Sequence, residues 1–107
     1  MNNLSKIRAS MAKAGLDAVL LTSEVNRHYA AGYNIAEGVA VISATGARYL
    51  TDSRYIEAAE QNLPGFEVQM VGRGVTYNAL LEAALADFGV HTLGFEESVM
   101  TVTELEG

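Results

Sequence analysis

The stretch A-G-L-D-A-V-L-L, from Ala14 to Leu21, contains the signals that decide the fold class. It starts at the end of a segment, 4–14, whose apolar residues recur at helical spacing, and Gly15 is a natural stop for such a helix. Residues 18–21 then show no polar alternation, which is typical of a strand buried on both faces. A helix, a glycine and a buried strand in this order indicate an α/β domain.

The same phrase returns as F-G-V-H-T-L-G-F, Phe88 to Phe95, and we interpret it as one type of connection used twice, not as a sequence repeat. Periodicity, caps and turn signals predict further helices over 24–31, 54–62 and 77–88, and strands over 38–43, 48–51, 66–71 and 92–95. Asp52 and Ser53 are expected to cap the helix near Arg54, and residues 100–105 are a candidate start of another helix. The order predicts one α/β domain with a mixed sheet flanked by helices.

The composition limits the classes of function. A chain of 107 residues, 50% of them apolar, forms one domain with a hydrophobic core. The absence of cysteine excludes disulfides and thiolate chemistry, and a net charge of −6 argues against general nucleic-acid binding. No apolar run is long enough to span a membrane, and the N-terminus lacks the apolar core of a secretory signal, so we expect a cytoplasmic protein.

Metal and nucleophile patterns do not stand out in the sequence. His28 and His91 are far apart, with no H-x-x-x-H pair, and no G-x-S-x-G motif is present. The loop G-R-G-V-T, Gly72 to Thr76, lies between a strand and a helix, where it could hold an anion, but the third glycine of G-x-G-x-x-G is replaced by Tyr77. We therefore expect no catalytic and no metal residue in this chain, and favour a plain connecting loop.

Two polar clusters remain, N-R-H-Y-A-A-G-Y (26–33) and T-D-S-R-Y (51–55), and both follow predicted strands. Binding residues of α/β sheets usually lie at the carboxyl ends of strands. A structural interpretation stays open, in which Asp52 caps a helix, Arg54 pairs with Asp52 or a surface glutamate, and Tyr29 and Tyr55 are core aromatics.

These clusters resemble a known family. N-R-H-Y-A-A-G-Y resembles the N-x-x-Y-L-T-G-F phrase of the N-terminal domain shared by Xaa-Pro dipeptidases (prolidases), aminopeptidase P and creatinase, and T-D-S-R-Y resembles its T-D-G-R-Y. G-L-D-A-V-L-L-T-S (15–23) and L-G-F-E-E-S-V-M-T (93–101) also resemble phrases of that domain, in the same order. The chain departs from the pattern at Ala30, Ala31, Tyr33 and Ser53; if the family glycine at position 53 has a positive φ, Ser53 would be strained.

The resemblance implies a mixed sheet with flanking helices, like a ribonuclease H-like motif, in a non-catalytic domain over residues 1–107. It implies that hydrolysis occurs in a following pita-bread domain, absent from this chain, where two Asp, one His and two Glu bind two divalent metal ions. It further implies a homodimer whose N-terminal domains shape the active-site entrance, and a proline-containing peptide substrate in the whole enzyme; no cofactor is expected in this chain.

The expected entrance or interface residues are the loop 34–37 and a set drawn from both clusters: Asn26, Tyr29, Asn34, Asp52, Arg54 and Tyr55. The alternative is a stand-alone small-molecule-binding or dimerisation module of the same fold. These residues leave open whether the substrate is a proline-containing peptide or a creatine-like molecule. They also leave the identity of the metal open.

Overall fold

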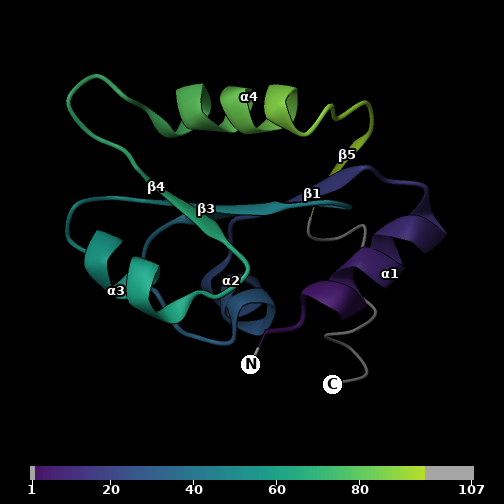
Figure 1. Ribbon diagram of the computed structural model, residues 1–107, viewed down its shortest axis with the longest axis horizontal. Coiled ribbons are helices and arrows are strands. Elements are labelled where there is room, and N and C mark those ends of the chain that lie inside the picture. Colours follow the sequence, from purple (N-terminus) through teal and green to yellow (C-terminus); the bar gives the residue numbers. More distant parts are fainter. Residues whose placement is uncertain (1, 96–107) are drawn as a thin grey trace.

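The computed structural model describes residues 2–95, which form a five-stranded mixed sheet with helices on both faces (Figure 1). The predicted α/β order is confirmed, and most element boundaries differ from the predictions by a residue or two. The elements are α1 (Leu4–Ala14), β1 (Ala18–Leu21), α2 (Glu24–Ala31), β2 (Val39–Ser43), β3 (Ala47–Thr51), α3 (Ile56–Asn62), β4 (Glu67–Met70), α4 (Tyr77–Asp87) and β5 (Leu93–Phe95). The candidate helix at 100–105 lies outside the described residues.

The strand order is β4-β3-β2-β1-β5. β2 pairs antiparallel with β1 and β3, whereas β3–β4 and β1–β5 are parallel pairs, so β1, β3, β4 and β5 share one direction. The crossovers β3–α3–β4 and β4–α4–β5 run in opposite directions along the sheet. Because such crossovers are right-handed, their helices must lie on opposite faces. Figure 1 shows this arrangement, with α4 above the sheet and α3, α2 and α1 below it.

The two copies of the repeated phrase lie side by side, because β1 and β5 pair in parallel. Asp17 fixes the connection: its Oδ2 accepts hydrogen bonds from the backbone N–H groups of His91 (2.9 Å) and Thr92 (3.1 Å). Gly94 permits close packing here, since a Cβ on it would lie 2.2 Å from Leu16 Cδ1. The aspartate and the glycine of the two phrases therefore join the first strand to the last.

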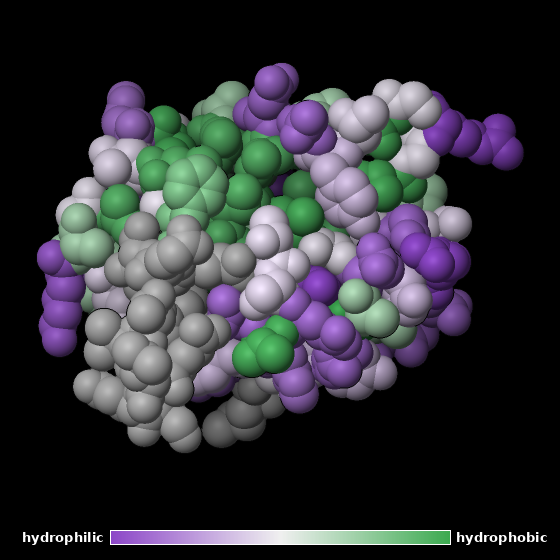
Figure 2. All heavy atoms as spheres, turned by 180° about the vertical axis from the view of Figure 1, so that it is seen from behind, coloured by the Kyte–Doolittle hydropathy of each residue, from purple (hydrophilic) through white to green (hydrophobic). Residues whose placement is uncertain are grey.

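The main core lies between the sheet and the helices α1, α2 and α3. Its largest fully buried side chains include Tyr49, Met11 and Leu21. Among the described residues, α4 is the helix that covers the opposite face, and of the apolar positions predicted for it only Ala84 is fully buried. Figure 2, seen from behind, shows apolar side chains gathered in the upper half of the molecule, where α4 lies.

The predicted capping of α3 by Asp52 and Ser53 was wrong. Helix α3 begins at Ile56 with Tyr55 at its N-cap, and no side chain caps it, because the carboxylate of Asp52 accepts hydrogen bonds from Arg54 instead. Ser53 stands at the position of the family glycine without a positive φ, since Arg73 is the non-glycine residue with positive φ in the described chain. Met70 is 49% exposed at the end of β4, which is an edge strand of the sheet.

At Gly38 the backbone packs closely against Tyr49 and Leu50 of β3. Its φ is +151°, and a Cβ would lie 2.6 Å from Tyr49 Cε1 and 2.8 Å from the Leu50 carbonyl oxygen, whereas Gly72 has a similar φ of +135° and open space around it. Both Gly→Ala substitutions impose backbone strain, but only Gly38→Ala adds a collision. We expect Gly38→Ala to lower the free energy of unfolding by about 1–3 kcal/mol more than Gly72→Ala, measured by urea denaturation. Equal losses for the two variants would contradict the close approach.

Candidate functional site

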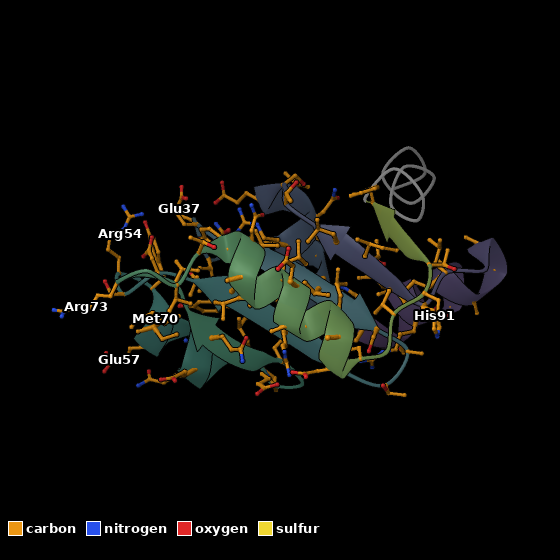
Figure 3. All side chains as sticks on the ribbon, turned by 90° about the horizontal axis from the view of Figure 1, so that it is seen from above. Glu37, Arg54, Glu57, Met70, Arg73 and His91 are labelled. Carbon is orange, nitrogen blue, oxygen red and sulfur yellow. The ribbon has the colours of Figure 1, made fainter. Side chains whose placement is uncertain are left out.

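The carboxyl ends of the parallel strands place the two polar clusters at one edge of the sheet. Residues 22–37 follow β1, and residues 52–55 follow β3. We call the loop 34–37 together with Asp52, Arg54 and Tyr55 the rim. Figure 3 shows Glu37, Arg54 and Arg73 at this end of the molecule, and His91 at the opposite end. Each cluster follows its strand, as the sequence predicted, and the rim residues lie at the same end of the sheet.

Asp52 and Arg54 form a local ion pair at the rim. Arg54 Nη2 donates to Asp52 Oδ2 at 2.7 Å, and the Arg54 backbone N–H donates to Asp52 Oδ1 at 2.9 Å. The side-chain hydrogen bond from Arg54 lowers the pKa of Asp52 below its ordinary value. In turn, the hydrogen bond to Asp52 raises the pKa of Arg54, with a smaller contribution from Glu37. The side chain of Arg54 is 66% exposed, so it remains accessible to a ligand while it is paired with Asp52.

Tyr55 provides a surface for this guanidinium. The Cζ of Arg54 lies 5.2 Å from the centroid of the Tyr55 ring, and the ring itself packs against the core cluster. A cation over an aromatic face is held in place by the ring's electron density. The arginine is therefore oriented by an acid on one side and a ring on the other, and it presents a planar cation that suits a carboxylate.

Helix α2 begins and ends as its sequence predicts. The hydroxyl of Ser23 accepts from the Asn26 backbone N–H at 3.1 Å, and Gly32 ends the helix with a φ of +75°. The helix buries two polar residues, Asn26 and Arg27, each 5% exposed. The burial of Arg27 was not predicted, because an arginine beside a histidine on a short polar helix is typical of a solvated position.

Arg27 lies against the loop that follows its own helix. Its Nη1 donates to the carbonyl oxygen of Ile35 at 2.8 Å and to the hydroxyl of Tyr49 at 2.7 Å. Its Nε donates to the Thr22 carbonyl oxygen at 3.2 Å, and its Nη2 contacts the Ala36 carbonyl oxygen at 3.5 Å. Within residues 2–95 its hydrogen-bond acceptors are thus carbonyl and hydroxyl oxygens, not carboxylates. Burial raises the pKa of the Tyr49 phenol, and the hydrogen bond from Arg27 opposes part of that rise.

A second buried arginine lies on the other face of the sheet. Arg48 is 8% exposed, and its Nε donates to Glu67 Oε1 at 2.9 Å while its Nη2 pairs with Asp87. Its Cζ lies 5.2 Å from the centroid of the Phe88 ring. Burial by itself would lower the pKa of Arg48, but the two carboxylates outweigh it and raise that pKa. These contacts join β3 and β4 to α4, a helix with a single fully buried residue.

The other predicted site residues have different surroundings. Asn34 is exposed on the rim loop, whereas Asn26 is buried. Tyr29 is half-buried against the core cluster, and its carbonyl oxygen accepts from Asn3 Nδ2 at 2.7 Å. Asn26 and Tyr29 therefore belong to the packing of α2, and the structure does not bring them to the exposed surface of the rim.

The G-R-G loop is a tight hairpin. Gly72 and Val75 exchange backbone hydrogen bonds of 2.8 and 2.9 Å, and the two residues between them, Arg73 and Gly74, have φ values of +50° and +87°. Positive φ at both central residues is the property of a type I′ turn, which follows the twist of the flanking strands. The backbone of this loop is thus paired with itself, which supports the plain connecting loop predicted from the sequence.

Two kinds of feature are absent from the part of the chain that the structure describes, a metal-binding group and a membrane-spanning helix. Across residues 2–95, no three His, Asp or Glu side chains are grouped as a metal ion would require. Within the same range, no helix combines the length and the apolar character needed to cross a bilayer.

The ion pair at the rim can be tested by titration. Arg54→Ala removes the hydrogen bonds that favour the ionised carboxylate, so we expect the pKa of Asp52 to rise towards its ordinary value. Because that pKa is lowered in the folded state, the pair contributes stability above the ordinary pKa of an aspartate and loses it as the pH falls. NMR titration of the Asp52 side-chain carboxyl carbon measures the shift, with Arg73→Ala as a control at the same end of the molecule. An unchanged Asp52 pKa would contradict the pairing.

Comparison with known proteins identifies the domain. Residues 3–107 match the model of the creatinase/prolidase N-terminal domain. The chain is 36% identical over 98 residues to the uncharacterized peptidase YqhT of Bacillus subtilis, a match that covers 92% of this chain and 27% of that protein. The chain therefore spans about a quarter of the length of this curated relative.

Solved structures agree with this assignment. The Xaa-Pro dipeptidase from Bacillus anthracis superposes with a TM-score of 0.78 at 29% identity, over 96% of this chain and 28% of that one. The N-terminal domain of the cytoplasmic peptidase PepQ from Mycobacterium tuberculosis superposes with a TM-score of 0.73 at 33% identity, over 96% of this chain and 78% of that one. With its sheet order, its flanking helices and its two polar phrases in place, the chain belongs to the creatinase/prolidase N-terminal domain family.

Proposed function

We propose that this chain is the non-catalytic N-terminal domain of an Xaa-Pro peptidase, and that its rim borders the entrance to a catalytic site carried by the rest of the parent protein. The observation that carries the proposal is the exposed guanidinium of Arg54, oriented by Asp52 and Tyr55 at the carboxyl ends of the strands. Its free donors suit the carboxylate or the backbone carbonyl oxygens of a peptide.

The chemistry of the described residues fits an accessory role. Hydrolysis by a metal pair needs several carboxylates and a histidine that converge on the ions. The rim carboxylate of Asp52 is instead bound to Arg54, and no suitable group of ligands occurs within residues 2–95. Because the described residues do not offer the ligands of a two-metal centre, we propose that the rest of the parent protein binds the two divalent ions.

The proposal also includes a homodimer in which the rim of one subunit faces the catalytic domain of its partner or its own. The family membership and the relatives' greater length support a larger parent chain. We further propose that this parent acts in the cytoplasm on proline-containing peptides. Sedimentation of the full-length protein measures its assembly, and a monomer that retains full activity would overturn the dimer.

The coding sequence gives the first test. We expect the reading frame to continue past Gly107 through a domain with two Asp, one His and two Glu in order. Sequencing the gene beyond codon 107 reads this directly. A stop codon at that point would overturn the peptidase proposal and favour the alternative, a stand-alone binding or dimerisation module.

Kinetics of the full-length protein test the rim. Arg54→Ala removes a charge-assisted contact, so we expect kcat/KM for an Xaa-Pro dipeptide to fall about tenfold, mainly through KM. Arg54→Lys keeps the charge but loses the planar fork, and should recover only part of the activity. Lys13→Ala, an exposed cation in the last turn of α1 and away from the rim, is the matched control. Unchanged kinetics in a stable Arg54→Ala protein would overturn the role of the rim.

A further inference from the structure

Side chains from α2 and β3 donate hydrogen bonds to consecutive carbonyl oxygens of the loop between α2 and β2. Arg27 donates to the carbonyl oxygens of Ile35 and Ala36. The hydroxyl of Thr51 donates to the carbonyl oxygen of Glu37 at 2.8 Å. Three consecutive peptide groups therefore have their orientation set by residues of α2 and β3. A loop with three successive carbonyl groups bonded to the core side has little freedom to change its path without breaking those bonds.

Tyr49 completes this arrangement. Its hydroxyl is one of the acceptors for Arg27 Nη1, its ring meets the edge of Phe66 at a centroid distance of 6.1 Å, and it is 1% exposed. Gly38, at the end of the loop, passes so close to this ring that a Cβ would collide with it. Tyr49 therefore limits the loop sterically at one end and supports the arginine that holds it at the other.

Loss of the loop carbonyl groups would be unfavourable for the buried guanidinium of Arg27. A buried N–H donor without an acceptor is strongly unfavourable, and more so when the group is charged. The described acceptors of Arg27 are the loop carbonyls, the Thr22 carbonyl and the Tyr49 hydroxyl, so an open loop would leave the cation without two of them. Opening the loop and exposing Arg27 are coupled events.

The position of the loop determines which charged groups meet at the rim. Glu37 is the exposed residue at the end of the loop, and it lies close enough to Arg54 to contribute to the raised pKa of that arginine. Figure 3 shows Glu37 and Arg54 at the same end of the molecule. The charge pattern of the rim thus depends on where a buried arginine holds the loop.

We propose that Arg27 and Tyr49 are positioning residues that hold the loop 34–37 in one preformed conformation and so fix the position of Glu37 beside Arg54. The loop is a rigid part of the rim and not a lid that closes over a ligand. This inference deepens the proposed function, since it rests on the rim facing a ligand, but its first test needs only the chain itself. A relative's N-terminal domain has been crystallised as a separate chain, which supports working with this domain alone.

Native-state proteolysis tests the arrangement at one peptide bond. A glutamate-specific protease can cut after Glu37 only when the loop opens, whereas the bonds after Glu57 and Glu60 lie in α3 and report on unfolding elsewhere. Arg27→Lys keeps the charge but cannot reach all the acceptors with one ammonium group. We expect cleavage after Glu37 to become about tenfold faster, with little change after Glu57 and Glu60.

Two further variants keep the test decisive. Tyr49→Phe removes only the hydroxyl and should give a smaller increase at the same bond, even if Arg27→Lys does not fold. Arg48→Lys is the matched control, because Arg48 is equally buried but bonds to Glu67 and Asp87 on the other face. It should not selectively expose the bond after Glu37. Equal acceleration at all three bonds, or none after Glu37 in both Arg27→Lys and Tyr49→Phe, would overturn the proposal.

Kinetics of the full-length protein then separate this inference from the proposed function. If the loop 34–37 opens in Arg27→Lys and KM rises while kcat is retained, the positioning role of Arg27 and the proposed role of the rim are both supported. If the loop opens and the kinetics do not change, the positioning stands and the role of the rim fails. If the loop stays closed in both variants, the positioning fails whatever Arg54→Ala does.

Discussion

A guanidinium buried in a protein interior must find an oxygen for its donors, and this requirement organises the end of the domain that carries the rim. Arg27 is 5% exposed, and its partners come from the turn after β1, the loop before β2 and the middle of β3. Such a group is destabilising unless every element around it is correctly placed. It therefore contributes specificity: the loop, the helix and the strand can satisfy it only in their native arrangement.

The two buried arginines act on opposite faces of the sheet and by different means. Arg27 is surrounded by neutral oxygens and holds a loop, whereas Arg48 pairs with Glu67 and Asp87 and holds a helix. The difference follows from the surroundings. The first lies beside the main core, where a loop passes over the sheet, and the second lies beneath a single helix whose outer edges are open to water. Carboxylates can remain half-solvated at that open edge while they neutralise the cation.

The direction of the strands explains why polar residues from separate parts of the chain meet. Only β2 runs against the others, so the segments after β1 and β3 leave the sheet at the same edge. That edge carries the exposed Arg54, whereas the Asp17 connection that joins β1 to β5 precedes those strands, at their opposite ends. One end of the domain therefore maintains the sheet, and the other is free to present charged groups to the rest of a parent protein.

The sequence by itself determined the α/β order, the ends of α1 and α2, the family resemblance and the edge at which the polar phrases lie. It could do so because caps, periodicity and strand-end positions are local properties of the chain. The tertiary structure decided what Arg27, Arg48 and Asp52 do. Arg27 bonds to a tyrosine 22 residues away and Arg48 to an aspartate 39 residues away, and such pairs leave no periodic signal. For Asp52 the sequence left a helix cap and a pair with Arg54 open, because its side chain can serve either partner, and only the path of the turn decides for Arg54.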